Sequence, residues 1–394
     1  MRDSGELLAT EADIRAFAAV ARAEGQLALD TEFVWEKTYA PVPCLIQVAT
    51  RERVALLDPI EGAAIEPIAE LVADRAVEIV MHAPSADLLL FALRYDSLAT
   101  NVFDTQTVGG FIGYGSSLAY DRMVERSTGT KLEHNETFSV WSRRPLTETQ
   151  LAYAADDVRY LLPAADAMRD ALSKTGRTSW AADELERRFG NPEAIVAAPE
   201  RAYLKVSRRG RLTGRQLSCL RAVAAWRETE ARRRDLPKEW VLKDASLIEV
   251  ARQAPRDAEA IGKLRGLGSI NGASLDALVA AVEAGVTGEP IAPAKDLPPG
   301  LARRINAAAA LGTVLARVRC EAANIAPEVG ASRSDIEAYT EAVVRDAVTD
   351  ESLGSGWRHE LLGAELRELI EGRVALVPMP EAPYVRTFPL QPTE

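Results

Sequence analysis

The sequence is poor in the side chains that build soft metal sites and disulfide frameworks. Its 394 residues include only three cysteines (Cys44, Cys219 and Cys320) and three histidines. Cysteines this far apart form neither a disulfide framework nor a CxxC zinc site, and so few histidines argue against a histidine-based metal centre. We therefore expect any metal ion to be held by carboxylates.

Long apolar runs are absent as well. No stretch reaches the roughly 18 apolar residues of a membrane helix, and the N-terminus has acidic charges instead of the apolar segment of a signal peptide. Hydrophobic residues make up 47% and charged residues 27%, as in a globular protein with packed cores. We expect about two to four domains in a cytoplasmic protein with no membrane partner, and we favour a monomer.

The net charge of −11 is unevenly distributed. Residues 201–270 carry 17 basic and 8 acidic side chains, a net charge of +9 inside an acidic protein. A basic segment of this kind favours an anionic partner such as a nucleic acid, although a solvated helix surface would give the same count.

The first part of the chain has the pattern of a mixed α/β sheet. Residues 26–33, 44–50 and 54–58 are predicted strands, closely spaced as in antiparallel neighbours. A fourth predicted strand, 77–81, is followed by a helix through 87–93. Strands in a meander, followed by strands that alternate with helices, indicate a mixed sheet flanked by helices.

The remainder reads as helical. Apolar residues recur at helical spacing from about residue 212. A Pro/Gly-rich linker at 286–300 separates this block from a second helical block that ends near residue 373. Prolines recur after residue 377, so the tail should be extended rather than helical.

Two carboxylates stand out on the first predicted strand. Asp30 and Glu32 are two residues apart, so both side chains point to one face. The run 27–29 is apolar on both faces, which predicts a central strand, and carboxylates that leave a buried strand need a partner or a cation. The alternative is an exposed pair at a strand end.

A third carboxylate, Asp87, lies at the start of the helix after the fourth strand. Ser85 is the predicted cap of that helix, which puts Asp87 in its first turn, toward the carboxyl end of the sheet. The alternative is that Asp87 only complements the helix dipole.

The fourth carboxylate belongs to a helix with a clear start. Thr147 and Gln150 form a predicted capping box, which fixes the helix phase. Tyr153 and Asp157 then lie one turn apart on one face, while Asp156 is expected to face water. The pair is either a surface hydrogen bond or a carboxylate that holds a metal ion beside a phenol that orients its water.

Four carboxylates suit the hydrolysis of a phosphodiester. That reaction needs an activated water and relief of charge on the leaving oxygen, and two divalent ions supply both. Mg²⁺ prefers oxygen ligands, so four acids can hold two such ions without any histidine.

The motifs together resemble those of the DEDD 3′→5′ exonucleases. Asp30-Thr-Glu32-Phe33 resembles the first motif, His82-Ala-x-x-x-Asp87-Leu88 the second, and Tyr153-Ala-Ala-Asp-Asp157 the third in its tyrosine form. Their order and spacing are similar to those of ribonuclease D over roughly residues 10–190.

This resemblance implies a ribonuclease H-like (DnaQ-like) exonuclease fold and a two-metal mechanism. Asp30, Glu32, Asp87 and Asp157 would hold two Mg²⁺ or Mn²⁺ ions, and Tyr153 would orient the attacking water. The implied activity is a 3′→5′ exoribonuclease that releases nucleoside 5′-monophosphates, with tRNA precursors as substrates. Two rivals stay open: an exonuclease on single-stranded DNA, and a binding protein with a vestigial nuclease core.

The helical remainder also resembles known modules. Residues 217–268 look like an HRDC domain, a helical nucleic-acid-binding module, and coincide with the basic segment. The second block resembles a more diverged HRDC-like domain. The predicted organisation is an exonuclease domain at 1–195, an HRDC domain at 208–285, a linker at 286–300, a second HRDC-like domain at 301–375 and a tail at 376–394.

Five further residues are candidate substrate contacts. Phe33 could stack on a terminal base or fill the core, and His82 could line the site or be structural. Arg232, Arg233 and Arg234 could contact phosphates, or form a solvated helix end beside Asp235.

Overall fold

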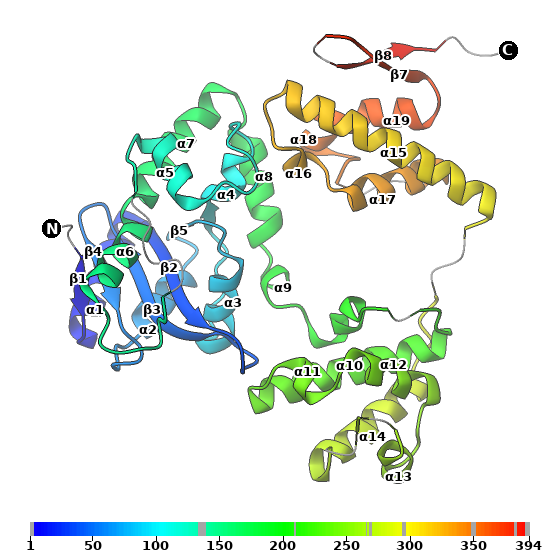
Figure 1. Cartoon of the computed structure of the whole chain (residues 1–394), viewed down its shortest axis with the longest axis horizontal. Coiled ribbons are helices and arrows are strands. Elements are labelled where there is room, and N and C mark those ends of the chain that lie inside the picture. Colours follow the sequence, from blue (N-terminus) through cyan, green and yellow to red (C-terminus); the bar gives the residue numbers. More distant parts are fainter. Residues whose placement is uncertain are drawn as a thin grey trace.

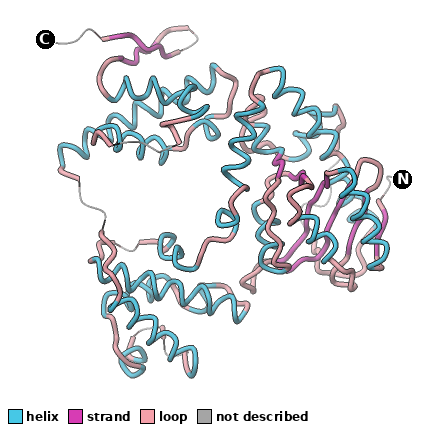
Figure 2. Tube along the Cα trace, turned by 180° about the vertical axis from the view of Figure 1, so that it is seen from behind, coloured by secondary structure: helices cyan, strands magenta, loops and turns pink. Residues whose placement is uncertain are grey.

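The computed structural model describes most of the chain and forms three lobes (Figures 1 and 2). The described residues are 4–132, 139–208, 210–264, 266–267, 270–293, 297–347, 352–381 and 384–390. Within these ranges, no helix is long and apolar enough to cross a bilayer. Parts of the predicted linker (294–296) and of the predicted tail (382–383 and 391–394) lie outside them.

A six-stranded mixed sheet forms the centre of the first lobe. Its strand order is β1-β4-β3-β2-β5-β6, so β2 is a central strand, as predicted. The predicted antiparallel pairing of β2 with β3 and of β3 with β4 is confirmed, and β2 pairs with β5 in parallel. The edge strands β1 and β6 are three residues each and were not predicted, because so short a segment shows no alternation of apolar and polar residues.

Helices cover both faces of the sheet (Figure 1). Leu27 and Leu29 of β2 face one apolar cluster, which also contains residues of α1, α2 and α3. Ala28, between them, faces a second cluster that contains residues of α5 and α7. The alternation of side chains along β2 therefore decides which helices its later residues, Asp30 and Glu32, can meet.

The elements of the first lobe follow one another with short connections. They are β1 (Glu6–Leu8), α1 (Glu11–Glu24), β2 (Gln26–Val34), β3 (Val42–Ala49), β4 (Val54–Leu57), α2 (Glu66–Val72), β5 (Glu78–Met81), α3 (Ser85–Arg94), β6 (Val102–Asp104), α4 (Thr105–Gly109), α5 (Tyr120–Thr128), α6 (Glu148–Arg159), α7 (Leu161–Lys174), α8 (Thr178–Phe189) and α9 (Pro192–Ile195).

The second lobe is the predicted first helical block. It contains α10 (Gly214–Arg234), α11 (Lys238–Val241), α12 (Asp244–Gln253), α13 (Ala258–Gly262) and α14 (Gly272–Thr287), preceded by a 3₁₀ segment (Pro199–Lys205). A capping box of Thr213 and Gln216 starts α10.

The C-terminus of α10 docks on the first lobe. Asp235, which follows α10, accepts hydrogen bonds from the backbone N–H groups of Tyr39 (3.0 Å) and Ala40 (3.1 Å). Its carboxylate also pairs with Arg94 of α3 at 3.0 Å. Tyr39 packs against the core of the second lobe, and its hydroxyl donates to Glu228 at 2.8 Å. The contacted segments are the loop after β2 and the end of α3.

The third lobe is the predicted second helical block; it has an apolar cluster of its own and also contributes residues to the second apolar cluster of the first lobe. It contains α15 (Pro299–Ala322), α16 (Pro327–Gly330), α17 (Arg333–Val344), α18 (Gly356–Arg358), a π-helical turn (His359–Gly363) and α19 (Ala364–Ile370). Trp357 stacks on Trp180 of α8 with ring centroids 5.4 Å apart and meets the ring of Phe111 at 5.1 Å.

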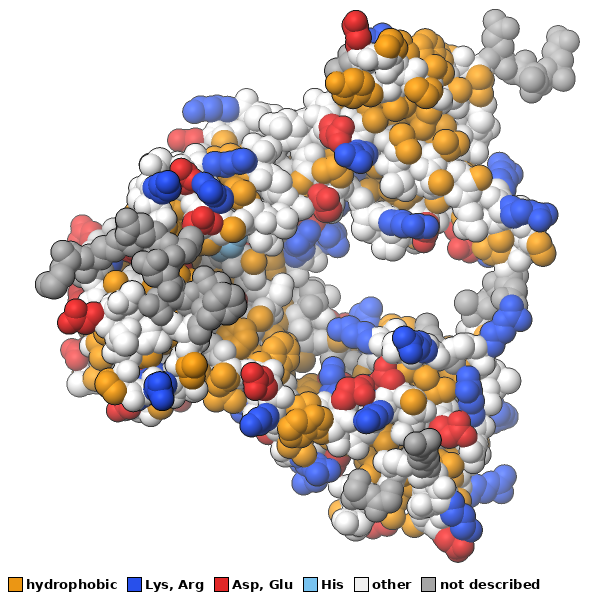
Figure 3. Space-filling model, viewed as in Figure 1, with side chains coloured by type: hydrophobic (Ala, Val, Ile, Leu, Met, Phe, Trp, Pro, Cys, Tyr) orange, Lys and Arg blue, Asp and Glu red, His pale blue; other side chains and the backbone are white. Residues whose placement is uncertain are grey.

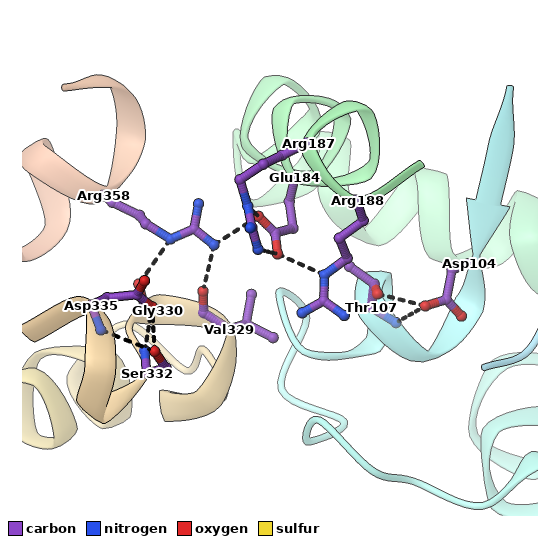
Figure 4. Close-up of polar contacts among 10 residues, drawn as sticks. All are labelled: Asp104, Thr107, Glu184, Arg187, Arg188, Val329, Gly330, Ser332, Asp335 and Arg358. Carbon is purple, nitrogen blue, oxygen red and sulfur yellow. Dashed lines mark hydrogen bonds and ion pairs between the residues drawn. The ribbon is translucent and has the colours of Figure 1, made fainter. Parts of the chain in front are cut away.

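A buried ion-pair cluster also connects the third lobe to α8 of the first lobe (Figure 4). Glu184 of α8 is fully buried and accepts hydrogen bonds from Arg187 and Arg188 of its own helix and from Arg358 of the third lobe, the last at 2.7 Å. Arg358 also donates to the carbonyl oxygens of Val329 and Gly330, each at 3.0 Å. Buried guanidinium and carboxylate groups are satisfied only by such partners, so the cluster specifies the docked arrangement.

The linker and the tail differ in detail from the sequence-based expectation. Helix α14 continues to Thr287 and α15 begins with Pro299, a residue that suits the first turn of a helix, so the non-helical connection is shorter than the Pro/Gly-rich stretch. Where the structure describes the tail it is extended, as predicted: the strands β7 (Val374–Pro378) and β8 (Val385–Pro389) pair in antiparallel fashion.

The three lobes surround an opening, which the space-filling view shows between the first lobe on the left, the second below and the third above (Figure 3). Lys and Arg side chains lie along its rim and over the second lobe.

Candidate active site

Strand β2 carries two of the four carboxylates. Asp30 and Glu32 lie on the face that Ala28 shares with the second apolar cluster, toward α6 and α7, while Thr31 between them points to the opposite face. The pairing of β2 with β3 shifts its register between Glu32 and Phe33, at the end of the strand where the carboxylates stand.

The third carboxylate, Asp87, lies in the first turn of α3, as predicted. It is 7% exposed and accepts a hydrogen bond from the hydroxyl of Thr31 on β2. The predicted cap is wrong: Pro84 occupies the N-cap, no side chain caps the helix, and Ser85 is its first residue. The Thr31 hydroxyl links α3 to β2 instead.

Helix α6 supplies the fourth carboxylate and the phenol. The predicted capping box of Thr147 and Gln150 is present, so α6 begins at Glu148 and has the predicted phase. Tyr153 and Asp157 are partly buried, and the Tyr153 ring lies 6.1 Å from that of Trp141. The expectation that Asp156 faces water is wrong: it is 9% exposed and its carboxylate pairs with Arg159 at 3.1 Å.

The four carboxylates act on one another electrostatically. Burial, followed by the charges of Asp87, Asp157 and Glu32, holds the pKa of Asp30 well above its usual range. Burial and the charge of Asp87 raise the pKa of Glu32 to about 7. Burial raises the pKa of Asp87 to about 6, and burial with the charge of Glu32 raises the pKa of Asp157 strongly. The sequence-based prediction that these acids gather is consistent with this mutual effect.

Two phenols border the acids. Burial, followed by the charges of Asp157, Glu32 and Asp30, raises the pKa of Tyr153 above its ordinary value, so its hydroxyl stays protonated and can donate a hydrogen bond. Tyr120 of α5, which the sequence analysis missed, donates to the carbonyl oxygen of Asp156 at 2.9 Å. Its only sequence signal is an aromatic residue at a helix start, which is too common to single out.

The donor set of this cluster fits a hard divalent cation. All four side chains offer carboxylate oxygens, the ligands that Mg²⁺ and Mn²⁺ prefer, and the burial and neighbouring charges that raise the pKa values of Asp30 and Glu32 disfavour ionisation in a way that a bound cation would reverse. In the described part of the chain, no three His, Cys, Asp or Glu side chains are grouped closely enough to hold an ion as they stand.

Two predicted substrate contacts, Phe33 and His82, belong to the first lobe. Phe33 is partly buried and packs against the first apolar cluster. Both ring nitrogens of His82 are engaged, Nδ1 with the hydroxyl of Thr105 at 2.8 Å and Nε2 with the carbonyl oxygen of Leu118 at 3.0 Å. Their contact with RNA stays a prediction.

The predicted arginine cluster lies apart from the acids, in the last turn of α10. Arg232, Arg233 and Arg234 are exposed. Arg233 donates to Glu230 at 2.8 Å, and Arg234 lies 4.0 Å from the same carboxylate. This turn adjoins Asp235, which docks the second lobe on the first. Phosphate contact by these arginines also stays a prediction.

Comparison with known proteins identifies the family. Residues 6–173 match the model of a family described as 3'-5' exonuclease, and residues 216–271 match that of the HRDC domain. A ribonuclease D from Granulibacter bethesdensis is 34% identical over 379 residues, which cover 95% of this chain and 94% of the relative. The chain belongs to the ribonuclease D family.

Other members of the ribonuclease D family agree over the same length. Ribonuclease D from Jannaschia sp. is 35% identical over 381 residues, 94% of this chain and 96% of that protein. The crystal structure of Escherichia coli RNase D matches with a TM-score of 0.74 and 31% identity, and covers 93% of this chain and 99% of that one.

Membership of the ribonuclease D family confirms several predictions. The chain is a 3′→5′ exoribonuclease with a 3'-5' exonuclease core of mixed α/β structure, and its first helical block contains an HRDC domain. The HRDC-like character of the second block and the domain boundaries stay predictions.

Proposed function

We propose that Asp30, Glu32, Asp87 and Asp157 hold two divalent metal ions, Mg²⁺ or Mn²⁺, at the 3′ end of an RNA chain. The observation that carries this proposal is a set of four acids from three elements, each with a pKa raised by burial and, for Asp30, Glu32 and Asp157, also by neighbouring acids of the set. Bound there, the ions would supply an activated water at neutral pH and neutralise charge on the leaving oxygen. The products are nucleoside 5′-monophosphates, released one at a time.

Tyr153 has the role of orienting the attacking water. Two observations support this role: Tyr153 lies one helical turn before Asp157, and its pKa is raised by burial and then by the charges of Asp157, Glu32 and Asp30. Because its pKa is raised, the phenol remains a hydrogen-bond donor and acceptor through the neutral pH range. The positioning of one water by one hydroxyl suits a group that is not itself a metal ligand.

The substrates are structured RNAs with a 3′ tail, and tRNA precursors are the class we favour. E. coli RNase D is described as an exoribonuclease involved in structured RNA processing. In this chain the segment 201–270, with its net charge of +9, supplies the attraction for the RNA backbone that the acidic remainder lacks. Within it, Arg232, Arg233 and Arg234 contact phosphates, while Phe33 and His82 line the path of the terminal nucleotides. The reaction takes place in the cytoplasm, because bacteria, in which the relatives occur, make their RNA there.

An RNA and a DNA of the same sequence, each with a label at the 5′ end, test this function side by side. With Mg²⁺ or Mn²⁺ we expect stepwise shortening of the RNA from its free 3′-hydroxyl and the appearance of nucleoside 5′-monophosphates. With excess EDTA we expect neither. Full activity in EDTA would refute the metal assignment, and shortening of the DNA at an equal rate would refute a preference for RNA.

A further inference from the structure

One buried polar side chain in the core has no explanation in the fold. Gln47 of β3 is 0% exposed, and neither its Nε2 nor its Oε1 atom has a hydrogen-bond partner among the described residues. Buried amides are nearly always hydrogen-bonded in native proteins, because their transfer from water is otherwise unfavourable. A partner that is not permanently in contact, or not part of the chain, would explain its retention.

The sheet places Gln47 directly beside Asp30. The two residues are cross-strand neighbours in the antiparallel ladder of β2 and β3. Such neighbours point to the same face with their Cβ atoms about 5 Å apart, within reach of a glutamine and a carboxylate. Gln47 therefore points toward the face with the acids, while the adjacent residues of β3, Ile46 and Val48, belong to the cluster on the other face.

Helix α6 covers this position. Leu56, the neighbour of Gln47 on β4, and Leu45, two residues before it on β3, form an apolar cluster with Ala154 of α6. Ala154 lies between Tyr153 and Asp157 in the sequence of that helix. Leu45, Leu56 and Ala154 are thus apolar residues near this position, and Asp30 is the acid that the strand register puts next to it.

Asp30 lacks the kind of partner that Asp87 has. The Asp87 carboxylate accepts a hydrogen bond from the hydroxyl of Thr31. In the described ranges, no side-chain donor is hydrogen-bonded to Asp30. Outer partners that donate to a ligating carboxylate fix its orientation, and their loss typically weakens metal affinity by about 10–100-fold.

We propose that Gln47 is a positioning residue for this reaction: once a metal ion is held by the Asp30 carboxylate, the Nε2–H group of Gln47 donates to that carboxylate and fixes its orientation toward the metal. The inference rests on the proposed function of the four acids. It assigns a reason to a buried amide that would otherwise only reduce stability, and it does not require Gln47 to touch the RNA.

Two substitutions of Gln47 test the proposal by Mn²⁺ binding, measured by calorimetry and by the metal-induced rise in Tm. Gln47→Leu and Gln47→Met both remove the donor with little change in volume, and Met adapts to the cavity if Leu does not fit. The matched control is Thr340→Val, which removes another fully buried side-chain oxygen without a partner among the described residues, in α17. The full-length chain is used throughout.

Both variants should keep or raise the Tm of the metal-free protein, and both should bind Mn²⁺ at least about tenfold more weakly, while Thr340→Val binds like the wild type. Wild-type Mn²⁺ affinity in either Gln47 variant would overturn the proposal. So would a fall in the Tm of the metal-free variant that accounts for the whole loss of Mn²⁺ affinity. If the wild type itself binds no Mn²⁺, the proposed function fails along with the inference. If the wild type binds Mn²⁺ and both Gln47 variants bind it equally well, the inference about Gln47 is refuted and the proposed function is not.

Discussion

Replacing Glu32 by glutamine should stabilise the metal-free protein and at the same time remove its activity. Burial and the charge of Asp87 raise the pKa of this partly exposed side chain from 4.5 to about 7. Since the folded-state pKa lies above the unfolded value, the group costs stability as the pH rises from about 4.5 through about 7. At a pH above both pKa values, the full shift corresponds to about 3 kcal/mol of lost stability. Structural relaxation and solvent screening reduce this loss, so we expect Glu32→Gln to gain about 1–3 kcal/mol at pH 8.

Thermal unfolding in EDTA at pH 8 and at pH 4.5 measures this effect. At pH 8 the Tm of Glu32→Gln should exceed that of the wild type by several degrees, because 1 kcal/mol shifts the Tm of a domain of about 150–250 residues by about 2–4 °C. At pH 4.5 the difference should largely disappear, because the wild-type side chain is then mostly neutral when folded. Addition of Mn²⁺ should raise the wild-type Tm more than that of the variant.

The matched control is Glu36→Gln, an exposed glutamate four residues further along the chain. It removes the same charge outside the cluster and should leave the Tm unchanged at both pH values. A Glu32→Gln protein that is less stable than the wild type at pH 8, or whose gain persists at pH 4.5, would refute the view that burial and the charge of Asp87 make the ionised Glu32 side chain destabilising.

Three further substitutions test the water-orienting role of Tyr153, the contact of the second lobe with the first, and the contact of the third lobe with the first. Tyr153→Phe should lower kcat by about 10²–10⁴-fold and leave Mn²⁺ affinity unchanged in calorimetry; loss of metal instead would make Tyr153 a ligand. Asp235→Ala removes the acceptor for the N–H groups of Tyr39 and Ala40 and should raise KM for a tRNA-like RNA about tenfold, with hydrolysis of a five-nucleotide RNA unaffected. The control is the exposed Asp276→Ala, and a KM for the tRNA-like RNA equal to that of the wild type would contradict the prediction. Arg358→Met should destabilise the contact between the third lobe and α8 by about 1–3 kcal/mol in urea unfolding followed by tryptophan fluorescence. The control is the exposed Arg304→Met, and an unchanged unfolding midpoint would show that the Glu184 cluster contributes nothing to stability.

The nuclease core could be predicted from the sequence wherever local patterns decide structure. The run 27–29, apolar on both faces, predicted a central strand, and the two-residue spacing of Asp30 and Glu32 predicted that they share one face; β2 has that central position. The capping box of Thr147 and Gln150 predicted the phase of α6 and hence the shared face of Tyr153 and Asp157. Such features depend on neighbours in the sequence, so no knowledge of the tertiary structure is needed.

Contacts between distant segments could not be predicted in this way. Asp156 was expected to face water because its helix position is next to the face of Asp157, but Arg159 and the packing of α5 bury it. The cap expected from Ser85 is wrong because the first helical hydrogen bond, from the N–H of Leu88, goes to the carbonyl oxygen of Pro84, which makes Ser85 a helical residue. The Thr31 hydroxyl reaches Asp87 across 56 residues of sequence. The contact of Arg358 with Glu184 spans 174 residues and has no local signal.

The hydrolysis of RNA by Asp157→Asn tests the central claim most directly. This change removes one carboxylate charge from α6 and keeps the shape of the side chain, so the fold should survive. With Mg²⁺ and a 5′-labelled RNA under single-turnover conditions, we expect the rate of nucleoside 5′-monophosphate release to fall by more than about 10²-fold, more than about 2.7 kcal/mol of barrier. A variant that keeps more than about a tenth of the wild-type rate, a loss of less than about 1.4 kcal/mol, would contradict the assignment of the four acids as the catalytic metal site.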